Sequence, residues 1–272
     1  MTELLHHAAR VEVLTDFTGL LRCTRITDVT HDVKSFELAL PDQAGLTFEP
    51  GQYLTIRVVV DGVPLERCYT ISSSPAQPQR PTITVKRAAT GPVSSWLHER
   101  LRLGDTLEAT GPYGLFSTAT HPAQKYLFLS AGSGISPLMS MTRALRDAAD
   151  DSSGCGPGPD VVFVHCARSP EDIIFRQELE QIAAQGVAAV TILCRQDSPR
   201  ETWAGPRGRL TLPALLTAAP DLLDREVFTC GPPAFMTAVR EHLELVAADP
   251  ARCHQEAFVL DAGAPPPPPD QD

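Results

Sequence analysis

The segment "RCYTISSSP", residues 67–75, combines residue types that can bind and orient a ligand. In a strand, side chains alternate between two faces, so Arg67, Tyr69 and Ile71 share one face while Cys68 and Thr70 share the other. Arg67 offers a guanidinium suited to a phosphate, and Tyr69 offers a flat ring suited to stacking. Taken alone, the segment fits an exposed Arg–Tyr pair on a surface strand equally well.

Two glycine-containing turns, "AGSGISPLM" (131–139) and "FTCGPPAFM" (228–236), each follow an apolar run and open a helical pattern. At such a helix start, unpaired amides and the positive end of the helix dipole suit a pyrophosphate. The first turn lacks the third glycine of G-x-G-x-x-G, so an ordinary strand–helix turn is the alternative. Cys230 is predicted at the C-terminal end of a strand, where open α/β sheets bind ligands. Alternatively, it is a buried thiol of the core.

These residues lie in two halves with different patterns. Residues 20–116 contain short runs rich in Val, Ile and Thr, bounded by Gly, Pro and Asp, which predict antiparallel strands. "VVVDGVPLERCYTI" predicts a hairpin around Asp61 and Gly62, and "SSWLHERL" predicts one helix. From residue 121, apolar runs alternate with helical patterns such as "EDIIFRQELEQIAA" (171–184).

The predicted fold class is therefore α/β plus all-β, with an N-terminal antiparallel Greek-key β-barrel and a C-terminal doubly wound parallel α/β sheet. We expect an extension over 1–19, a barrel domain over 20–118, an α/β domain over 119–260 and a proline-rich segment over 261–272. A five-proline run is stiff and solvated. It is interpreted as a solubilising tail or as a linker to a further domain.

Composition narrows the function. The 272 residues carry a formal net charge of −10, which argues against nucleic acid or an anionic membrane as a partner. No apolar run is long enough to span a bilayer, so a cytoplasmic location is expected. The seven cysteines have no C-x-x-C spacing, so neither a zinc site nor any other metal site is predicted.

Five motifs, in this order and spacing, resemble the ferredoxin–NADP reductase superfamily. They are "RCYTISS", "KRAATGPVSSWLH", "GPYGLF", "AGSGISPLM" and "CGPPAFM". The resemblance covers about residues 20–260 and is strongest to the reductase components of Rieske-type oxygenases and related hybrid reductases. It implies an FAD-binding barrel followed by a domain that binds a nicotinamide dinucleotide.

In the barrel, the resemblance places Arg67 on the flavin pyrophosphate, Tyr69 against the isoalloxazine and Thr70 near flavin N5. Lys86 and Arg87 begin a second flavin-binding segment, although a solvated strand end explains either residue as well. The cofactor-binding residues implied in this half are Arg67, Cys68, Tyr69, Thr70, Lys86, Arg87, Gly91, Val93, Ser94 and Ser95.

In the second half, the resemblance places the turn at 132–136 on the dinucleotide pyrophosphate and Cys230 near the nicotinamide C4. Glu256, in "EAF", is a candidate for proton handling or positioning, or else a surface carboxylate on an edge strand. The implied catalytic residues are Thr70, Cys230 and Glu256. The further dinucleotide-binding residues are Gly132, Ser133, Gly134, Ser136, Arg168, Ser169, Cys230, Gly231 and Pro232.

The implied reaction is hydride transfer from NADH or NADPH to FAD, followed by electron delivery to a 2Fe–2S ferredoxin that serves a Rieske-type oxygenase. The C-x4-C-x2-C spacing of a plant-type cluster is absent, so no iron–sulfur cluster is expected in this chain. We expect the ferredoxin in a longer form of the protein or as a separate protein. Alternatives are a free-standing flavin or ferric reductase, or a non-catalytic flavin-containing subunit.

The choice between NADH and NADPH depends on arginines and on one motif. The motif "TWAGPRGRL" (202–210) resembles NADH-using hybrid reductases, so NADH is the expected donor. Five arginines could instead pair with the 2′-phosphate of NADPH: Arg168, Arg195, Arg200, Arg207 and Arg209.

Overall fold

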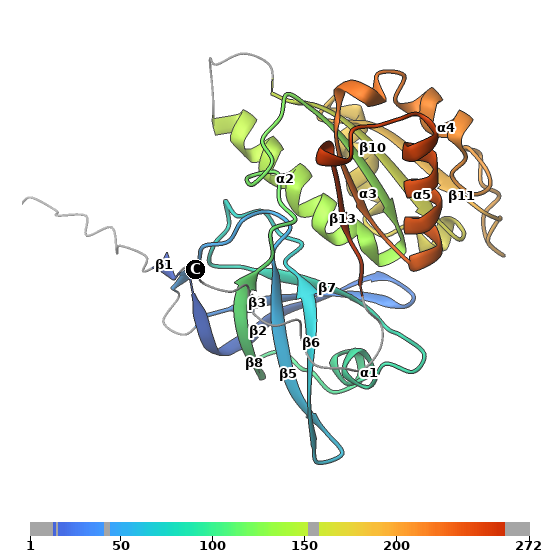
Figure 1. Ribbon diagram of the computed structural model, residues 1–272. Helices are drawn as coiled ribbons and strands as arrows, with labels where there is room; N and C mark the ends of the chain where they lie inside the picture. Colours follow the sequence, from blue (N-terminus) through green and yellow to red (C-terminus); the bar gives the residue numbers. More distant parts are fainter. Residues whose placement is uncertain (1–12, 15, 41–43, 152–157, 259–272) are drawn as a thin grey trace, which may run out of the picture.

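The structure, a computed structural model, describes residues 13–14, 16–40, 44–151 and 158–258. Figure 1 shows two lobes, a β lobe formed by the N-terminal half and an α/β lobe formed by the C-terminal half. This confirms the predicted combination of an antiparallel β-domain with a parallel α/β sheet. The predicted proline-rich segment and most of the predicted N-terminal extension lie outside the described residues.

The β lobe is one curled antiparallel sheet with the strand order β6-β5-β8-β2-β3-β7. Its strands are β2 (Phe17–Thr30), β3 (Val33–Ala39), β5 (Tyr53–Val60), β6 (Val63–Thr70), β7 (Thr82–Lys86) and β8 (Thr106–Tyr113). A small parallel pair, β1 (Val13–Leu14) and β4 (Gly45–Leu46), lies beside it. The predicted hairpin joins β5 to β6 through Asp61 and Gly62, whose φ angles of 49° and 81° are both left-handed.

The barrel is not fully closed. Its edge strands β6 and β7 are not paired in the described sheet order, and the chain just after β6 joins β7 through an isolated bridge from Ile71 to Ile83 and a hydrogen bond from the Ser72 amide to the Thr82 carbonyl at 2.7 Å. Helix α1 (Pro92–Glu99) follows β7 and packs on β5 and β6. Both bridge residues are fully buried in the core of the lobe, so the curl is held from inside while an open seam remains between the two edges.

The α/β lobe is a five-stranded parallel sheet with the order β11-β10-β9-β12-β13. Its strands are β9 (Lys125–Ala131), β10 (Asp160–Ala167), β11 (Ala189–Cys194), β12 (Glu226–Cys230) and β13 (Cys253–Glu256). Its helices are α2 (Ile135–Asp151), α3 (Arg176–Ala184), α4 (Leu212–Ala218) and α5 (Pro233–Leu245). Four short 3-10 turns complete it: η2 (Gly132–Gly134), η3 (Pro170–Asp172), η4 (Leu222–Asp224) and η5 (Pro250–Arg252).

Two apolar cores lie on opposite faces of this sheet. Residues of α2 and α3 pack on one face with Phe128 and Phe163, and residues of α4 and α5 pack on the other with Leu127 and Val164. The sheet is therefore doubly wound, as predicted. Helix α3 begins later than predicted, because Phe175 has a left-handed φ of 58° that interrupts the helical backbone before Arg176.

No helix within the described ranges is both long and apolar enough to cross a membrane.

Candidate active site between the two lobes

One cavity of about 870 Å3 is lined by both lobes. Predicted site residues contribute much of its wall: Arg67, Cys68, Tyr69, Thr70, Lys86, Arg87, Gly91, Val93, Ser94, Gly132, Ser133, Ser136, Arg168 and Pro232. Six other predicted residues do not line it: Ser95, Gly134, Ser169, Cys230, Gly231 and Glu256. The structure thus brings residues from both halves of the sequence around one space that is large enough for more than one small molecule.

Strand β6 supplies the barrel side of the cavity. Arg67 and Tyr69 lie opposite Ile56 and Leu54 in the β5–β6 register, so they share the face that turns toward the barrel core. Thr70 is 4% exposed, and its Oγ1 is buried without a hydrogen-bond partner in the described structure. A buried hydroxyl without a partner is costly, so Thr70 is suited to a polar ligand atom that the cavity would hold.

The second predicted flavin segment has its polar groups engaged within the chain. Lys86 Nζ lies 2.8 Å from Asp32, and Arg87 lies 3.7 Å from Glu99. Ser94 Oγ donates to the Gly91 carbonyl at 3.0 Å and accepts from the Ala88 amide at 3.1 Å. The Ser94 hydroxyl therefore shapes the loop before α1.

On the side of the α/β sheet, the turn at 132–134 allows a ligand to approach the backbone closely. Gly132 has a left-handed φ of 54° and open space where a Cβ would lie, so its backbone can face a ligand. At Gly134 the reason for glycine is different, because a Cβ there would lie 2.3 Å from the Cys230 carbonyl oxygen. Gly134 thus lets the start of α2 pack directly on the end of β12.

Cys230 and Glu256 lie side by side as the last residues of β12 and β13. They are register partners on β12 and β13, and Cys230 is fully buried. Burial, and secondarily the Glu256 carboxylate, raises the pKa of the Cys230 thiol well above its ordinary value. Burial also raises the pKa of Glu256 to about 7, and its Oε2 is buried without a hydrogen-bond partner in the described structure.

Arg168 and Ser169 share one carboxylate. Arg168 Nη2 lies 2.9 Å from Asp172 Oδ1, and Ser169 Oγ donates to Asp172 Oδ2 at 2.6 Å. Arg168 still lines the cavity, whereas Ser169 is turned toward Asp172. Its pairing with Asp172 reduces the charge that Arg168 can offer to an anion.

Several lining residues were not among the predicted site residues. Phe235 follows the Gly-Pro-Pro turn, Phe258 is the last described residue, and Cys166 lies near the end of β10. Phe235 lies in "CGPPAFM" and Phe258 in "EAF", so the aromatic residue type within these motifs was the signal that could have identified them. Arg195 and Arg209, two of the 2′-phosphate candidates, also line the cavity.

Two clusters carry metal-ligating atoms, but neighbouring groups already use or oppose them. In the first, His254 Nε2 lies 2.6 Å from Glu226 and its ring stacks on His121 with 3.7 Å between centroids. The second cluster, His31, Asp32 and Asp172, faces the cations of Lys86 and Arg168, which would repel a metal ion.

Comparisons with known proteins agree with this division. Residues 21–118 match the oxidoreductase FAD-binding domain, and residues 128–241 match the oxidoreductase NAD-binding domain. The chain is 40% identical over 260 residues to the glycine betaine monooxygenase reductase subunit of Chromohalobacter salexigens, covering 95% of this chain and 69% of that one. The chain belongs to the ferredoxin–NADP reductase family.

Other members of the family extend the likeness. This reductase-family chain is 44% identical over 240 residues to the glycine betaine monooxygenase reductase subunit of Pseudomonas aeruginosa, covering 88% of this chain. It spans only 64% of the length of that relative. The solved structure of phthalate dioxygenase reductase is 25% identical with a TM-score of 0.70, covering 89% of this chain and 68% of that one.

The cavity fits the two ligands that these domains bind. FAD and a nicotinamide dinucleotide each need room for a ring, polar partners for that ring and a site for phosphate. Thr70 offers a buried hydroxyl without a partner, and Gly132 opens the backbone at a helix start. Arg67 adds a cation whose one hydrogen bond within the described structure is to the Glu66 carbonyl, at 2.7 Å.

The raised pKa of Glu256 makes the stability of this reductase-family protein depend on pH. The folded protein holds the Glu256 proton up to about pH 7, whereas an unfolded chain releases it near the ordinary value of 4.5. Stability therefore falls as pH rises from about 4.5 to 7. Glu256→Gln is expected to remove this loss, so that the variant gains about 3 kcal/mol over the native protein between these limits.

Thermal unfolding of both proteins across this pH range measures the effect. Glu241→Gln, on an exposed position of α5, is the control and should track the native protein at every pH. A Glu256→Gln curve parallel to the native curve would show that folding does not raise the pKa of Glu256.

Proposed function

We propose that this chain forms the electron-entry module of an oxygenase system. It takes electrons from NADH through FAD and passes them to a 2Fe–2S ferredoxin, fused or separate, that serves a Rieske-type oxygenase. The observation that carries the proposal is the single cavity walled by strand β6 of the FAD-binding domain and turn η2 of the NAD-binding domain. The names of the relatives, which are reductase subunits of oxygenases, supply the partner class.

The residues of the chain have separate tasks in this proposal. When bound, FAD accepts a hydride from the nicotinamide and releases electrons one at a time. Thr70 supplies a hydroxyl to the flavin ring, and Arg67 supplies a cation to the flavin phosphates. Gly132, Ser133 and Ser136 present the start of α2 to the dinucleotide pyrophosphate.

In this proposal Cys230 and Glu256 do not line the cavity themselves but lie behind the lining residues, as a buried floor on the nicotinamide side. Both are held by β12 and β13, so their positions follow from the sheet itself. The high pKa of the Cys230 thiol keeps it neutral, and the raised pKa of Glu256 lets its carboxyl group hold a proton near neutral pH. A neutral floor avoids repelling electron density that moves from one ring to the other.

NADH is the proposed donor. Arg168 is paired with Asp172, and Arg207 with Asp197 at 2.7 Å, so neither is free to bind a 2′-phosphate. Arg195 and Arg209 line the cavity without a side-chain partner in the described structure, so turnover with NADPH is the direct comparison. We infer a cytoplasmic location, where reduced nicotinamide nucleotides are available.

The test uses purified protein loaded with FAD. We expect retention of FAD through gel filtration, bleaching of the flavin spectrum by NADH and faster turnover with NADH than with NADPH, with ferricyanide as acceptor. Rapid loss of FAD would favour a free-standing flavin reductase. A protein that refuses FAD, or retains FAD that NADH does not bleach, would contradict the proposal.

A further inference from the structure

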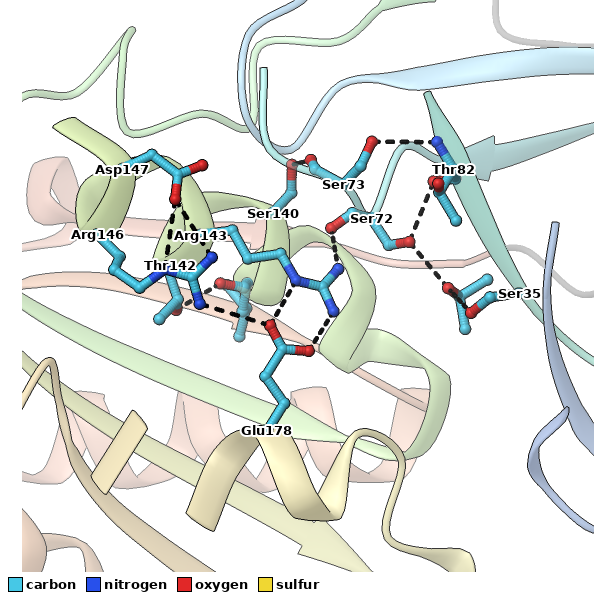
Figure 2. A network of polar contacts seen from close by, with 12 residues as sticks. Ser35, Ser72, Ser73, Thr82, Ser140, Thr142, Arg143, Arg146, Asp147 and Glu178 are labelled. Carbon is cyan, nitrogen blue, oxygen red and sulfur yellow. Dashed lines mark hydrogen bonds and ion pairs between the residues drawn. The ribbon is translucent and has the colours of Figure 1, made fainter. Parts of the chain in front are cut away.

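One face of α2 is used twice. Its start, at Ser136, lines the cavity, and its next two turns carry Ser140 and Arg143 on the same side. Spacings of four and three residues place these side chains in one row along a helix. Figure 2 shows that Ser140 and Arg143 reach the barrel segment 72–74, which follows β6.

Both contacts hold the main chain of the barrel. Ser140 Oγ donates to the Ser73 carbonyl at 2.8 Å, and Arg143 Nη1 donates to the Ser72 carbonyl. Ser140 and Ser72 are fully buried. A hydrogen bond to a backbone carbonyl fixes the path of the chain, so these contacts set where segment 72–74 lies relative to α2.

The Arg143 side chain is itself held in place. Its Nε donates to Glu178 Oε1 at 2.8 Å, and its Nη2 donates to Glu178 Oε2. Its guanidinium carbon lies 4.6 Å from the centre of the Phe175 ring. A paired bidentate contact and a stacked ring leave the guanidinium one orientation, and Nη1 is then directed at the Ser72 carbonyl.

Segment 72–74 is equally fixed on the barrel side. Ser72 Oγ lies 2.8 Å from Thr84 Oγ1, and Ser73 Oγ accepts from the Thr82 amide at 3.0 Å. Thr84 lines the cavity, as does Thr70 two residues before Ser72. A displacement of Ser72 is therefore transmitted to residues that face the flavin side of the cavity.

We propose that Arg143 is a positioning residue that sets the spacing between the flavin side and the nicotinamide side of the cavity. This inference rests on the proposed function. The chain from Thr70 through Ser72 and Arg143 to α2 ends at the turn that receives the dinucleotide. The contact between the lobes from His31 to Asp172, at 3.9 Å, involves an exposed imidazole and gives weaker control than Arg143 and Ser140.

The primary variant is Arg143→Met, which keeps much of the length and removes the donor to Ser72. Hydride transfer depends steeply on alignment, so flavin reduction at saturating NADH should slow by about 10- to 100-fold. The dissociation constants of FAD and NADH should stay within about threefold, because each ligand keeps its own lobe. Stopped-flow reduction and ligand titration measure these quantities.

Arg146→Met is the matched control. Arg146 lies one turn further along α2, contacts Asp147 at 3.2 Å and Glu178 only at 4.0 Å, and has no hydrogen bond to segment 72–74 in the described structure. The flavin of Arg146→Met should be reduced by NADH at the native rate. Arg143→Lys keeps the charge and loses the bidentate contact, so its rate of flavin reduction should lie between those of the native protein and Arg143→Met.

The double variant Arg143→Met/Glu178→Met separates the effect of the lost hydrogen bond to Ser72 from the effect of the unpaired Glu178 carboxylate. Single removal of Arg143 leaves Glu178 with only the 4.0 Å contact to Arg146 and lowers stability. Removing both restores stability, but Ser72 still lacks its donor, so flavin reduction should remain slow. Recovery of the native rate in the double variant would overturn the inference.

A second measurement needs no bound cofactor. In the FAD-free protein, amide hydrogen exchange of a peptide covering residues 70–77 should be faster in Arg143→Met than in the native protein and unchanged in Arg146→Met. If Arg143→Met does not fold, Ser140→Ala tests the same contact through Ser73.

The outcomes are distinct. Native protein that NADH does not reduce contradicts the proposed function, and hydrogen exchange then decides whether Arg143 holds segment 72–74. Native protein that is reduced, beside an Arg143→Met variant of equal rate or equal exchange, overturns the positioning role alone.

Discussion

Gly134→Ala is expected to reduce the rate of NADH-dependent flavin reduction by about 100-fold, because a misplacement near 1 Å costs that much. Its Cβ would lie 2.3 Å from the Cys230 carbonyl oxygen and 2.6 Å from the Gly231 amide nitrogen. These are backbone atoms, so the start of α2 must move away from the end of β12. That movement separates the pyrophosphate turn from the floor at Cys230.

FAD binding should be retained in Gly134→Ala, since Gly134 lies in the NAD-binding domain. Stopped-flow kinetics gives the rate, and titration with FAD gives the affinity. Gly158→Ala is the control, because its Cβ would meet the Ala149 Cβ at an ordinary 3.6 Å. Equal reduction rates for the two variants would show that the packing of α2 on β12 does not govern the reaction.

Arg225→Met is expected to lower the free energy of unfolding by about 3–5 kcal/mol, the usual result of removing one partner of a buried ion pair. Arg225 is 5% exposed and lies 2.7 Å from both Asp160 Oδ2 and Asp221 Oδ1. It also donates to the Tyr126 carbonyl at 3.1 Å. Its loss removes these contacts where β9, β10 and β12 begin, and Asp221 keeps only Lys125, at 2.8 Å.

Thermal unfolding should show a midpoint lower by roughly 10 °C in Arg225→Met. Arg240→Met provides the comparison, because Arg240 is 58% exposed and lies 3.9 Å from Glu244. Well below the transition, the flavin reduction rate should match that of the native protein, since Arg225 lies at the opposite ends of the strands from the cavity. A midpoint unchanged from the native protein would show that water replaces the lost contacts.

Local patterns were enough to predict the architecture. Asp61 and Gly62 could be assigned to a two-residue turn because both tolerate left-handed backbone, and both adopt it. Alternation placed Arg67 and Tyr69 on one face, and the register with Ile56 and Leu54 confirms this. Unbroken apolar runs predicted buried parallel strands, because helices cover both faces of such a sheet.

Other features of the site depend on contacts between distant residues. Asp32 holds Lys86 from 54 positions away, and no local pattern signals this pairing. Ser94 has the residue type and place of an anion ligand, yet its hydroxyl bonds its own loop. Cys230 is the last residue of β12, at the strand end where it was predicted, but whether it faces the cavity or the core depends on packing that spacing does not encode.

The open seam between β6 and β7 has a consequence for the protein before it acquires its cofactor. Both edges border the cavity, and within the described structure they are joined just beyond β6, by the Ile71–Ile83 bridge and the contacts of Ser72 and Ser73 with β7. Free strand edges are templates for association with other chains, and a flavin seated along the seam would shield them. A chain without FAD is therefore expected to associate with other copies more readily than a chain that holds FAD.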